Sequence, residues 1–114
     1  KIGYFGASTG AAAALQAAAK FGRKIAAVVS RGGRPDLAGV SALEKVMSPT
    51  LLLVGGSDYG VIELNQQAYS RLQCEKQLVL IPEATHLFEE PGTLEQVANQ
   101  AADWFAHYLT DTAA

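Results

Sequence analysis

The sequence has little of what marks a membrane, secreted or metal-bound protein. Cys74 is its single cysteine, which excludes an internal disulfide and a zinc site built on cysteines, and fits a reducing, cytoplasmic compartment. No run approaches the roughly 20 apolar residues that cross a bilayer, and no basic segment followed by an apolar one indicates a signal peptide. Nine Lys and Arg residues against eleven Asp and Glu give a net charge of −2, so neither nucleic acid nor a membrane surface is an expected partner.

Apolar residues are abundant instead. They make up 49% of the 114 residues, against 18% that are charged, which excludes a disordered chain and allows one small domain. The chain opens at Lys1 without a methionine and runs directly into an apolar segment. We therefore expect residues 1–114 to form one domain, and to be a fragment that starts at a central strand and lacks its N-terminal part.

Short apolar runs alternate with helical patterns along the chain. Strands are expected at Lys1–Phe5, Lys24–Ser30, Leu51–Val54 and Gln77–Ile81, and helices at Thr9–Lys20, Ser41–Val46, Val61–Leu72 and from Thr93 onward. Strands that alternate with helices pair in parallel through right-handed crossovers, so the fold class is α/β, a three-layer sandwich around a mostly parallel sheet. If the strands lie in chain order, only the last helix covers the second face. A second copy of the chain or the missing N-terminal half would then cover the bare edge of the first strand.

The last helix has the clearest pattern. Thr93 and Gln96 have the spacing of a capping box at a helix start. The residues expected on its buried face are Leu94, Val97, Ala98, Ala101, Phe105 and Tyr108.

A glycine-flanked serine follows the first expected strand. The turn Gly6–Gly10 has the form G-x-S-x-G, and the Ala-rich helix begins directly after it. In a strand–turn–helix context this motif is typical of a nucleophile elbow, in which Ser8 takes a strained conformation and the glycines on both sides avoid clashes. The Thr9 N–H, at the start of the helix, is expected to bind an oxyanion.

An acid and a base follow two later strands. Asp58 comes after the third expected strand and His86 after the fourth, and Ser–Asp–His is the chain order of a hydrolase triad on this type of sheet. A serine hydroxyl needs an imidazole to take its proton, and the imidazole needs a carboxylate to hold its tautomer. Because the carboxyl ends of parallel strands share one rim, we expect the three side chains to converge there.

Three segments carry a resemblance to a known family. They read GYFGASTGAAAAL, PTLLLVGGSDYGV and PEATHLFEEPG, and with the closing helix they resemble the α/β-hydrolase fold, specifically its dienelactone-hydrolase-like branch. The loop VVSRGGRPDLAG is similar to the hydrolase half of bacterial proteins that join a phosphoribosyltransferase domain to such a hydrolase. The resemblance implies the C-terminal half of the fold, with Ser8 as nucleophile, Asp58 as acid and His86 as base.

The chain departs from the family pattern in two ways. The enzyme that gives the family its name has a cysteine nucleophile where this chain has Ser8, which argues against dienelactone itself as the substrate. The family's second oxyanion donor comes from a loop in the N-terminal half, and no residue of this sequence corresponds to it. The expected function is therefore a serine hydrolase for a small acyl substrate (an ester, thioester or lactone), with no metal or organic cofactor.

Several residues near the expected site carry weaker signals. Arg31 and Arg34 follow the second strand, where guanidinium groups could bind a phosphate or carboxylate of the substrate. Thr85 is expected to steady the loop of the histidine. Glu89 and Glu90 are expected to begin a solvated acidic turn.

Two other functions stay open at this point. The glycines at the first turn also resemble a dinucleotide-binding loop, in which Arg31 and Arg34 would receive an NADP 2′-phosphate and Ser8 would be a turn residue. The chain could instead be a folded interaction or dimerisation module without turnover.

Overall fold

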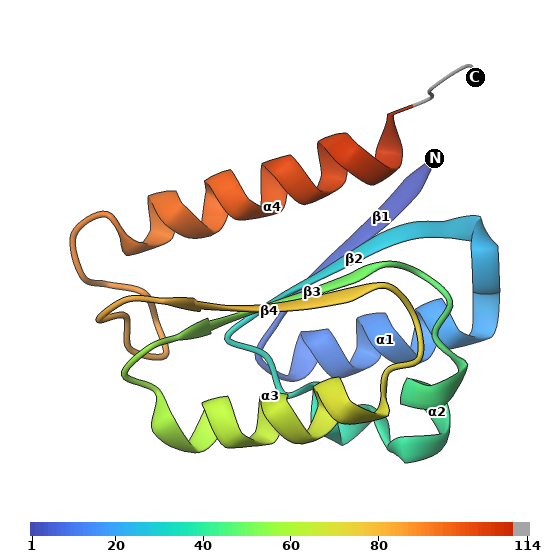
Figure 1. The fold of residues 1–114 in the computed structure, drawn as a ribbon, viewed down its shortest axis with the longest axis horizontal. Helices are drawn as coiled ribbons and strands as arrows, with labels where there is room; N and C mark the ends of the chain where they lie inside the picture. The colour runs from blue at the N-terminus through green and yellow to red at the C-terminus, as the bar shows by residue number, and fades with distance from the viewer. Residues whose placement is uncertain (111–114) are drawn as a thin grey trace.

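The fold is built on a four-stranded parallel sheet. The structure, a computed structural model, describes residues 1–110. Its strands are β1 (Ile2–Ala7), β2 (Ile25–Arg31), β3 (Thr50–Gly55) and β4 (Lys76–Ile81). They lie in the order β1-β2-β3-β4, each pair parallel (Figure 1). The expected strands and their parallel pairing are confirmed.

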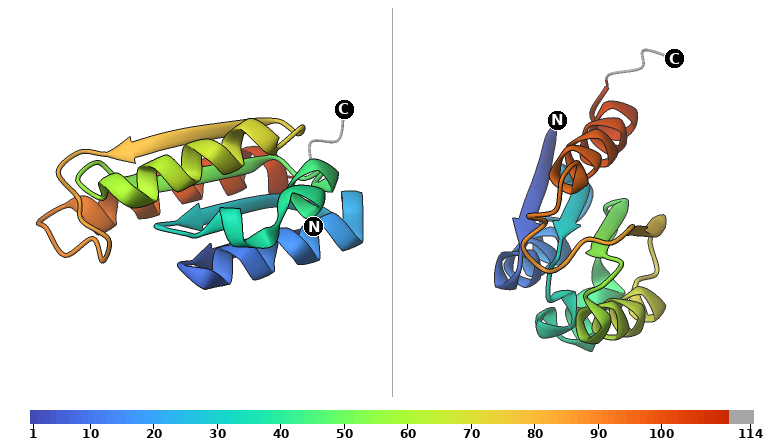
Figure 2. Two further views of the ribbon diagram at one scale, coloured as in Figure 1. Left: turned by 90° about the horizontal axis from the view of Figure 1, so that it is seen from below. Right: turned by 90° about the vertical axis from the view of Figure 1, so that its left-hand side faces the viewer.

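Helices cover the two faces of the sheet unequally. They are α1 (Thr9–Phe21), α2 (Val40–Lys45), α3 (Tyr59–Arg71) and α4 (Thr93–Leu109), with short 3₁₀ turns η1 (Gly22–Lys24) and η2 (Pro35–Ala38). Figures 1 and 2 show α1, α2 and α3 on one side of the sheet and α4 alone on the other. Right-handed crossovers between strands in chain order require this arrangement, and it confirms the three-layer α/β architecture.

Each face of the sheet has its own core. Leu52 of β3 packs with α1, α2 and α3, whereas Leu51 and Leu53 face α4. Every residue of β3 is buried, because successive side chains point to opposite faces and both faces are covered there. The small side chains of α1, with Ala11 and Ala18 fully buried, let that helix approach the sheet closely.

The outer strand β1 is less well covered. Ile2 is 56% exposed and Phe5 is 51% exposed, although α4 reaches β1 at Gly3, where an added Cβ would lie 2.7 Å from the Phe105 ring. Among the described residues, this edge therefore lies open, as the strand order predicts. No helix within residues 1–110 is both long enough and apolar enough to cross a membrane.

The start of α4 differs from the expectation. The capping box is wrong: the helix is capped by Gly92 in a left-handed conformation (φ 79°), without a side-chain capping bond. The Thr93 hydroxyl instead donates to the Glu90 carbonyl oxygen at 2.8 Å. Gly92 adopts this backbone without steric cost, so the turn is set by the glycine and Thr93 faces inward.

The buried face of α4 agrees only in part with the expectation. Val97 and Ala101 are buried as expected, but Leu94 is largely exposed and Ala98 is exposed as well. Thr93 occupies the buried position at the start of this stripe, whereas Phe105 and Tyr108 are half-buried on the expected face.

Candidate active site

Ser8 lies at the sharp turn between β1 and α1. Its backbone has φ 50° and ψ −126°, a region that costs a residue other than glycine about 1–3 kcal/mol. Ser8 is the N-cap of α1, yet its side chain makes no capping hydrogen bond. The hydroxyl is therefore left free to make a contact outside the helix.

Close packing around Gly6 explains why the chain turns here. A Cβ at Gly6 would lie 2.7 Å from both the Ala11 Cα and the Gly10 carbonyl oxygen, so no larger residue fits. Gly10 is different, because a Cβ there would meet nothing within 4 Å. The expectation that glycines on both sides avoid a clash therefore holds for Gly6 and is wrong for Gly10.

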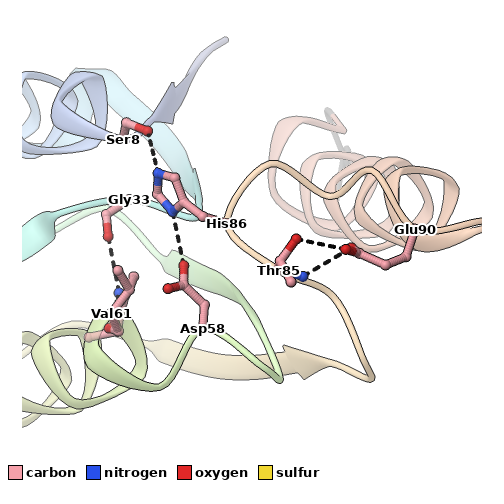
Figure 3. Close-up of polar contacts among 8 residues, drawn as sticks. Ser8, Gly33, Asp58, Val61, Thr85, His86 and Glu90 are labelled. Carbon is pink, nitrogen blue, oxygen red and sulfur yellow. Dashed lines mark hydrogen bonds and ion pairs between the residues drawn. The ribbon is translucent and has the colours of Figure 1, made fainter.

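Ser8, His86 and Asp58 form a chain of hydrogen bonds at the carboxyl ends of three strands (Figure 3). Ser8 Oγ lies 3.1 Å from His86 Nε2, and His86 Nδ1 lies 2.9 Å from Asp58 Oδ2. A carboxylate only accepts, so Nδ1 carries the proton toward Asp58, and Nε2 is free to accept the Ser8 hydroxyl proton. The structure thus brings together the three side chains that the sequence singled out. Their catalytic roles stay a prediction.

The turns that carry Asp58 and His86 are joined through their backbones. The Ser57 N–H donates to the Ala84 carbonyl oxygen at 3.0 Å, and the Gly56 N–H donates to that of Ile81 at 2.8 Å. A Cβ at Gly55 would lie 2.3 Å from the Ala84 oxygen. These contacts fix the carboxylate and the imidazole relative to each other.

The loop of His86 is also held by a carboxylate. Glu90 Oε1 accepts the Thr85 N–H at 3.0 Å, and Oε2 accepts the Thr85 hydroxyl at 2.7 Å (Figure 3). These two bonds lower the pKa of Glu90. Thr85 steadies the loop as expected. Glu89 is exposed, and the bonds between Glu90 and Thr85 also lie at an exposed position, so the expected solvated turn additionally binds Thr85.

Comparisons with known proteins identify the fold that carries these residues. The chain is 61% identical to a dienelactone hydrolase from Anabaena variabilis, whose crystal structure superposes with a TM-score of 0.92 over 95% of this chain and 50% of that one. The chain has the fold of the dienelactone-hydrolase-like α/β-hydrolases. An esterase domain from Rhodothermus marinus, 19% identical, shares this hydrolase fold with a TM-score of 0.84 over 95% of this chain and 62% of that one. No family model matches the sequence.

The curated relatives are longer proteins. Two Mycobacterium tuberculosis proteins, each named "Putative phosphoribosyl transferase" (Rv0571c and MT0597), are 63% identical over 108 residues, which is 95% of this chain and 24% of theirs. The chain thus spans about a quarter of the length of these relatives and half of the Anabaena hydrolase. This chain has a hydrolase fold and matches one part of proteins that are named phosphoribosyl transferases. Both findings agree with the expected resemblance to proteins that join a phosphoribosyltransferase to a hydrolase.

Thr9, the expected oxyanion donor, lies directly after Ser8 at the start of α1. Thr9 is the first residue of α1, and the first N–H groups of a helix have no acceptor within the helix. It therefore remains available beside the Ser8 hydroxyl. Its binding of an oxyanion stays a prediction.

The two arginines of the β2 loop already have partners. The Arg34 guanidinium binds both Asp36 oxygens, at 3.0 and 2.9 Å, which raises the pKa of Arg34 and lowers the pKa of Asp36. Arg31 lies over the Phe88 ring, 5.4 Å from its centre. A substrate anion would have to compete with Asp36 for Arg34, whereas Arg31 is half-buried beside the loop of His86.

One polar residue near the site was missed by the sequence reasoning. Asn65 of α3 is fully buried, and its Nδ2 donates to the carbonyl oxygens of Gly33 at 3.1 Å and Val61 at 2.8 Å. The buried residues of α3 are Asn65 and Ala68. An amide in line with buried residues at helical spacing is the signal that could have identified it.

The cavity described here lies away from the three side chains. Within residues 1–110, no group of three His, Cys, Asp or Glu residues could hold a metal ion. A cavity of about 230 Å³ lies between α2 and α3, and its lining residues are Asp36, Val40, Leu43, Gln67, Ala68 and Arg71. Since none of these is Ser8, Asp58 or His86, we do not assign this cavity to the substrate.

Proposed function

We propose that this chain is a serine hydrolase domain that cleaves an ester, thioester or lactone through an acyl-enzyme. The observation that supports this most directly is the unbroken hydrogen-bonded path from Ser8 through His86 to Asp58. The strained backbone of Ser8 adds support, because such strain occurs where the surroundings hold a functional residue in place. The similarity to a dienelactone hydrolase and to an esterase domain agrees with the fold that this chemistry uses.

In the proposed reaction, Ser8 Oγ attacks the carbonyl carbon while its proton passes to His86 Nε2. Asp58 stabilises the imidazolium that forms, and the Thr9 N–H donates to the developing oxyanion. The tetrahedral intermediate collapses, and the leaving group departs with the proton from Nε2. Water then attacks the acyl-enzyme with His86 as its base, which releases the acid and restores the Ser8 hydroxyl.

In this proposal the Thr9 N–H is one of two oxyanion donors. The resemblance assigns the second donor to a part of the fold outside this sequence. Because removal of one donor lowers kcat by about 10²–10³, we expect this chain by itself to turn over slowly. Acylation of Ser8 by a strongly activated reagent is therefore a better test than turnover of a natural ester.

A fluorophosphonate probe tests the proposal. We expect an adduct on Ser8, found by peptide mass spectrometry, and no adduct in the His86→Ala variant. His107→Ala is the matched control, because His107 lies exposed near the end of α4 and its loss should leave labelling unchanged. A folded chain that is not labelled at Ser8 would contradict the proposal and favour a module without turnover.

The nucleotide-binding alternative has less support. It needs free arginines for a 2′-phosphate, whereas Arg34 is bound by Asp36. It also gives no reason for the hydrogen bonds of His86 to Ser8 and Asp58. Tight binding in an NADPH titration, together with an unlabelled Ser8, would favour that alternative.

A further inference from the structure

The loop after β2 contacts the turn that carries Ser8. The Arg34 N–H donates to the Ser8 carbonyl oxygen at 2.9 Å, and the Gly32 N–H donates to the Leu53 carbonyl oxygen at 2.7 Å. The loop is thereby bonded to the strained residue on one side and to the central strand on the other. Its position determines where the Ser8 peptide can lie.

The same loop is packed without free space. A Cβ at Gly33 would lie 2.1 Å from Ser30 Oγ and 2.5 Å from the Ala11 Cβ. A Cβ at Gly32 would lie 3.1 Å from the Phe88 ring and 3.3 Å from the His86 carbonyl oxygen. The loop thus fills the space between α1 and the histidine loop, so a shift of its backbone would move the surroundings of both reacting groups.

Asn65 anchors this loop to α3, the helix that begins just after Asp58. Its side chain lies fully within the protein, and its Nδ2 donates to the Gly33 carbonyl oxygen at 3.1 Å. Its Oδ1 is buried without a partner in the described part of the chain. An unpaired buried oxygen destabilises a fold, and a leucine of similar shape would avoid it. What the amide provides is therefore a directed bond to the loop.

We propose that Asn65 is a positioning residue for the nucleophile. Its amide holds Gly33, the adjacent Arg34 N–H holds the Ser8 carbonyl, and Ser8 keeps the strained backbone that directs its hydroxyl to His86. Such a backbone persists only when the surrounding structure restrains it. This inference rests on the proposed function, because it assigns to Asn65 an effect on the reactivity of Ser8.

The variant Asn65→Leu tests the inference, with Ala68→Gly as control. Ala68 lies buried one turn further along α3, and its replacement weakens the same helix without removing a bond to the loop. Two quantities are measured under conditions where both variants are folded: hydrogen exchange of the Arg34 amide, and the rate of Ser8 labelling by the fluorophosphonate. For Asn65→Leu we expect both protection and labelling rate to fall on the order of tenfold, as for the loss of one buried hydrogen bond. Ala68→Gly should leave both near the wild-type values.

The inference is overturned if Asn65→Leu keeps the wild-type Arg34 protection and Ser8 labelling rate. It is also overturned if both variants lose these equally, because that result would indicate a general effect on stability. If Asn65→Leu does not fold, Asn65→Ala removes the same donor and is measured instead. A wild-type chain that is not labelled overturns the proposed function. If the wild type is not labelled, the exchange of the Arg34 amide still tests the anchoring role of Asn65. Unchanged exchange in Asn65→Leu overturns that role, and faster exchange supports it.

Discussion

The Ser8 turn and the His86 loop meet at one hydrogen bond, but they are held in different ways. Ser8 is fixed by steric fit, because Gly6 lies against the backbone of α1 with no space for a side chain. The outer part of the His86 loop is held by polar contacts between Thr85 and Glu90, at an exposed position. Exposure differs as well: the His86 side chain is 40% exposed, whereas Gly6 in the Ser8 turn is buried.

This difference indicates which changes each region tolerates. Steric fit depends on volume and backbone geometry, so the Ser8 turn should respond to small changes of size and little to charge. Surface hydrogen bonds to a carboxylate depend on charge and pH, so the His86 loop should respond to both. The four changes that follow test the comparison, in order of decreasing effect.

Asp58→Asn removes the negative charge that binds His86 Nδ1, and His86 in turn contacts Ser8. We expect a fall in kcat of about 10⁴, the effect known for this substitution in a serine triad, with the unfolding temperature little changed. Asp103→Asn is the matched control, because Asp103 is exposed on α4 and belongs to neither region. Since turnover by this chain is expected to be slow, the rate of Ser8 acylation by the fluorophosphonate is measured, and it should fall together with kcat. A loss below tenfold would contradict the role assigned to Asp58.

Gly6→Ala tests the steric fit of the Ser8 turn. The added Cβ would lie 2.7 Å from backbone atoms, and overpacking of this kind destabilises by about 1–3 kcal/mol or more. Gly10→Ala, which meets nothing within 4 Å, should instead stabilise by up to about 1 kcal/mol. Urea unfolding measures both. Equal effects of the two substitutions would show that the turn does not depend on the close contact at Gly6.

Glu90→Gln tests the polar contacts of the His86 loop. The amide presents a single, uncharged acceptor oxygen, so neither bond to Thr85 keeps a charged acceptor. We expect kcat to fall by about twofold to tenfold, on the order of one weakened hydrogen bond. Glu89→Gln, at an exposed neighbour, should have no effect. A Glu90→Gln variant with full activity would mean that the loop is held by its backbone alone.

Acid should weaken the same contacts. The bonds from Thr85 lower the pKa of Glu90 in the folded state, so their contribution to stability is present above the unfolded-state pKa. It is lost as the pH falls through the lower pKa of the folded state. Thermal melting from neutral to acidic pH should therefore show wild type and Glu90→Gln converging at the acid end. A difference that is independent of pH would contradict the assignment.

Much of the fold and the three converging side chains could be predicted from the sequence, because their signals are local. Ser8, Asp58 and His86 each follow a short apolar strand, and parallel strands bring such positions to one rim. The positions of the strands in the sequence are therefore enough to predict that the three side chains converge.

The features that could not be predicted depend on contacts between distant segments. Asn65 binds Gly33, which is 32 residues earlier in the chain, and no local pattern specifies that pair. The G-x-S-x-G motif contains Gly10 in either case, so the sequence does not show that a side chain would fit there. The predicted cap of α4 was wrong because Gly92, in a left-handed conformation, occupies the N-cap position expected for Thr93. The spacing of residues in the sequence does not decide between the two.

The open edge of the sheet has a consequence for how the chain could respond to association. β1 is the outermost strand among the described residues and ends at Ala7, directly before Ser8. A polypeptide aligned along this margin would extend the ladder of main-chain bonds as far as the peptide that leads into the reacting hydroxyl. Pairing along β1 would then restrain the backbone that leads into Ser8, so that association at the sheet edge would change the reactivity of its hydroxyl.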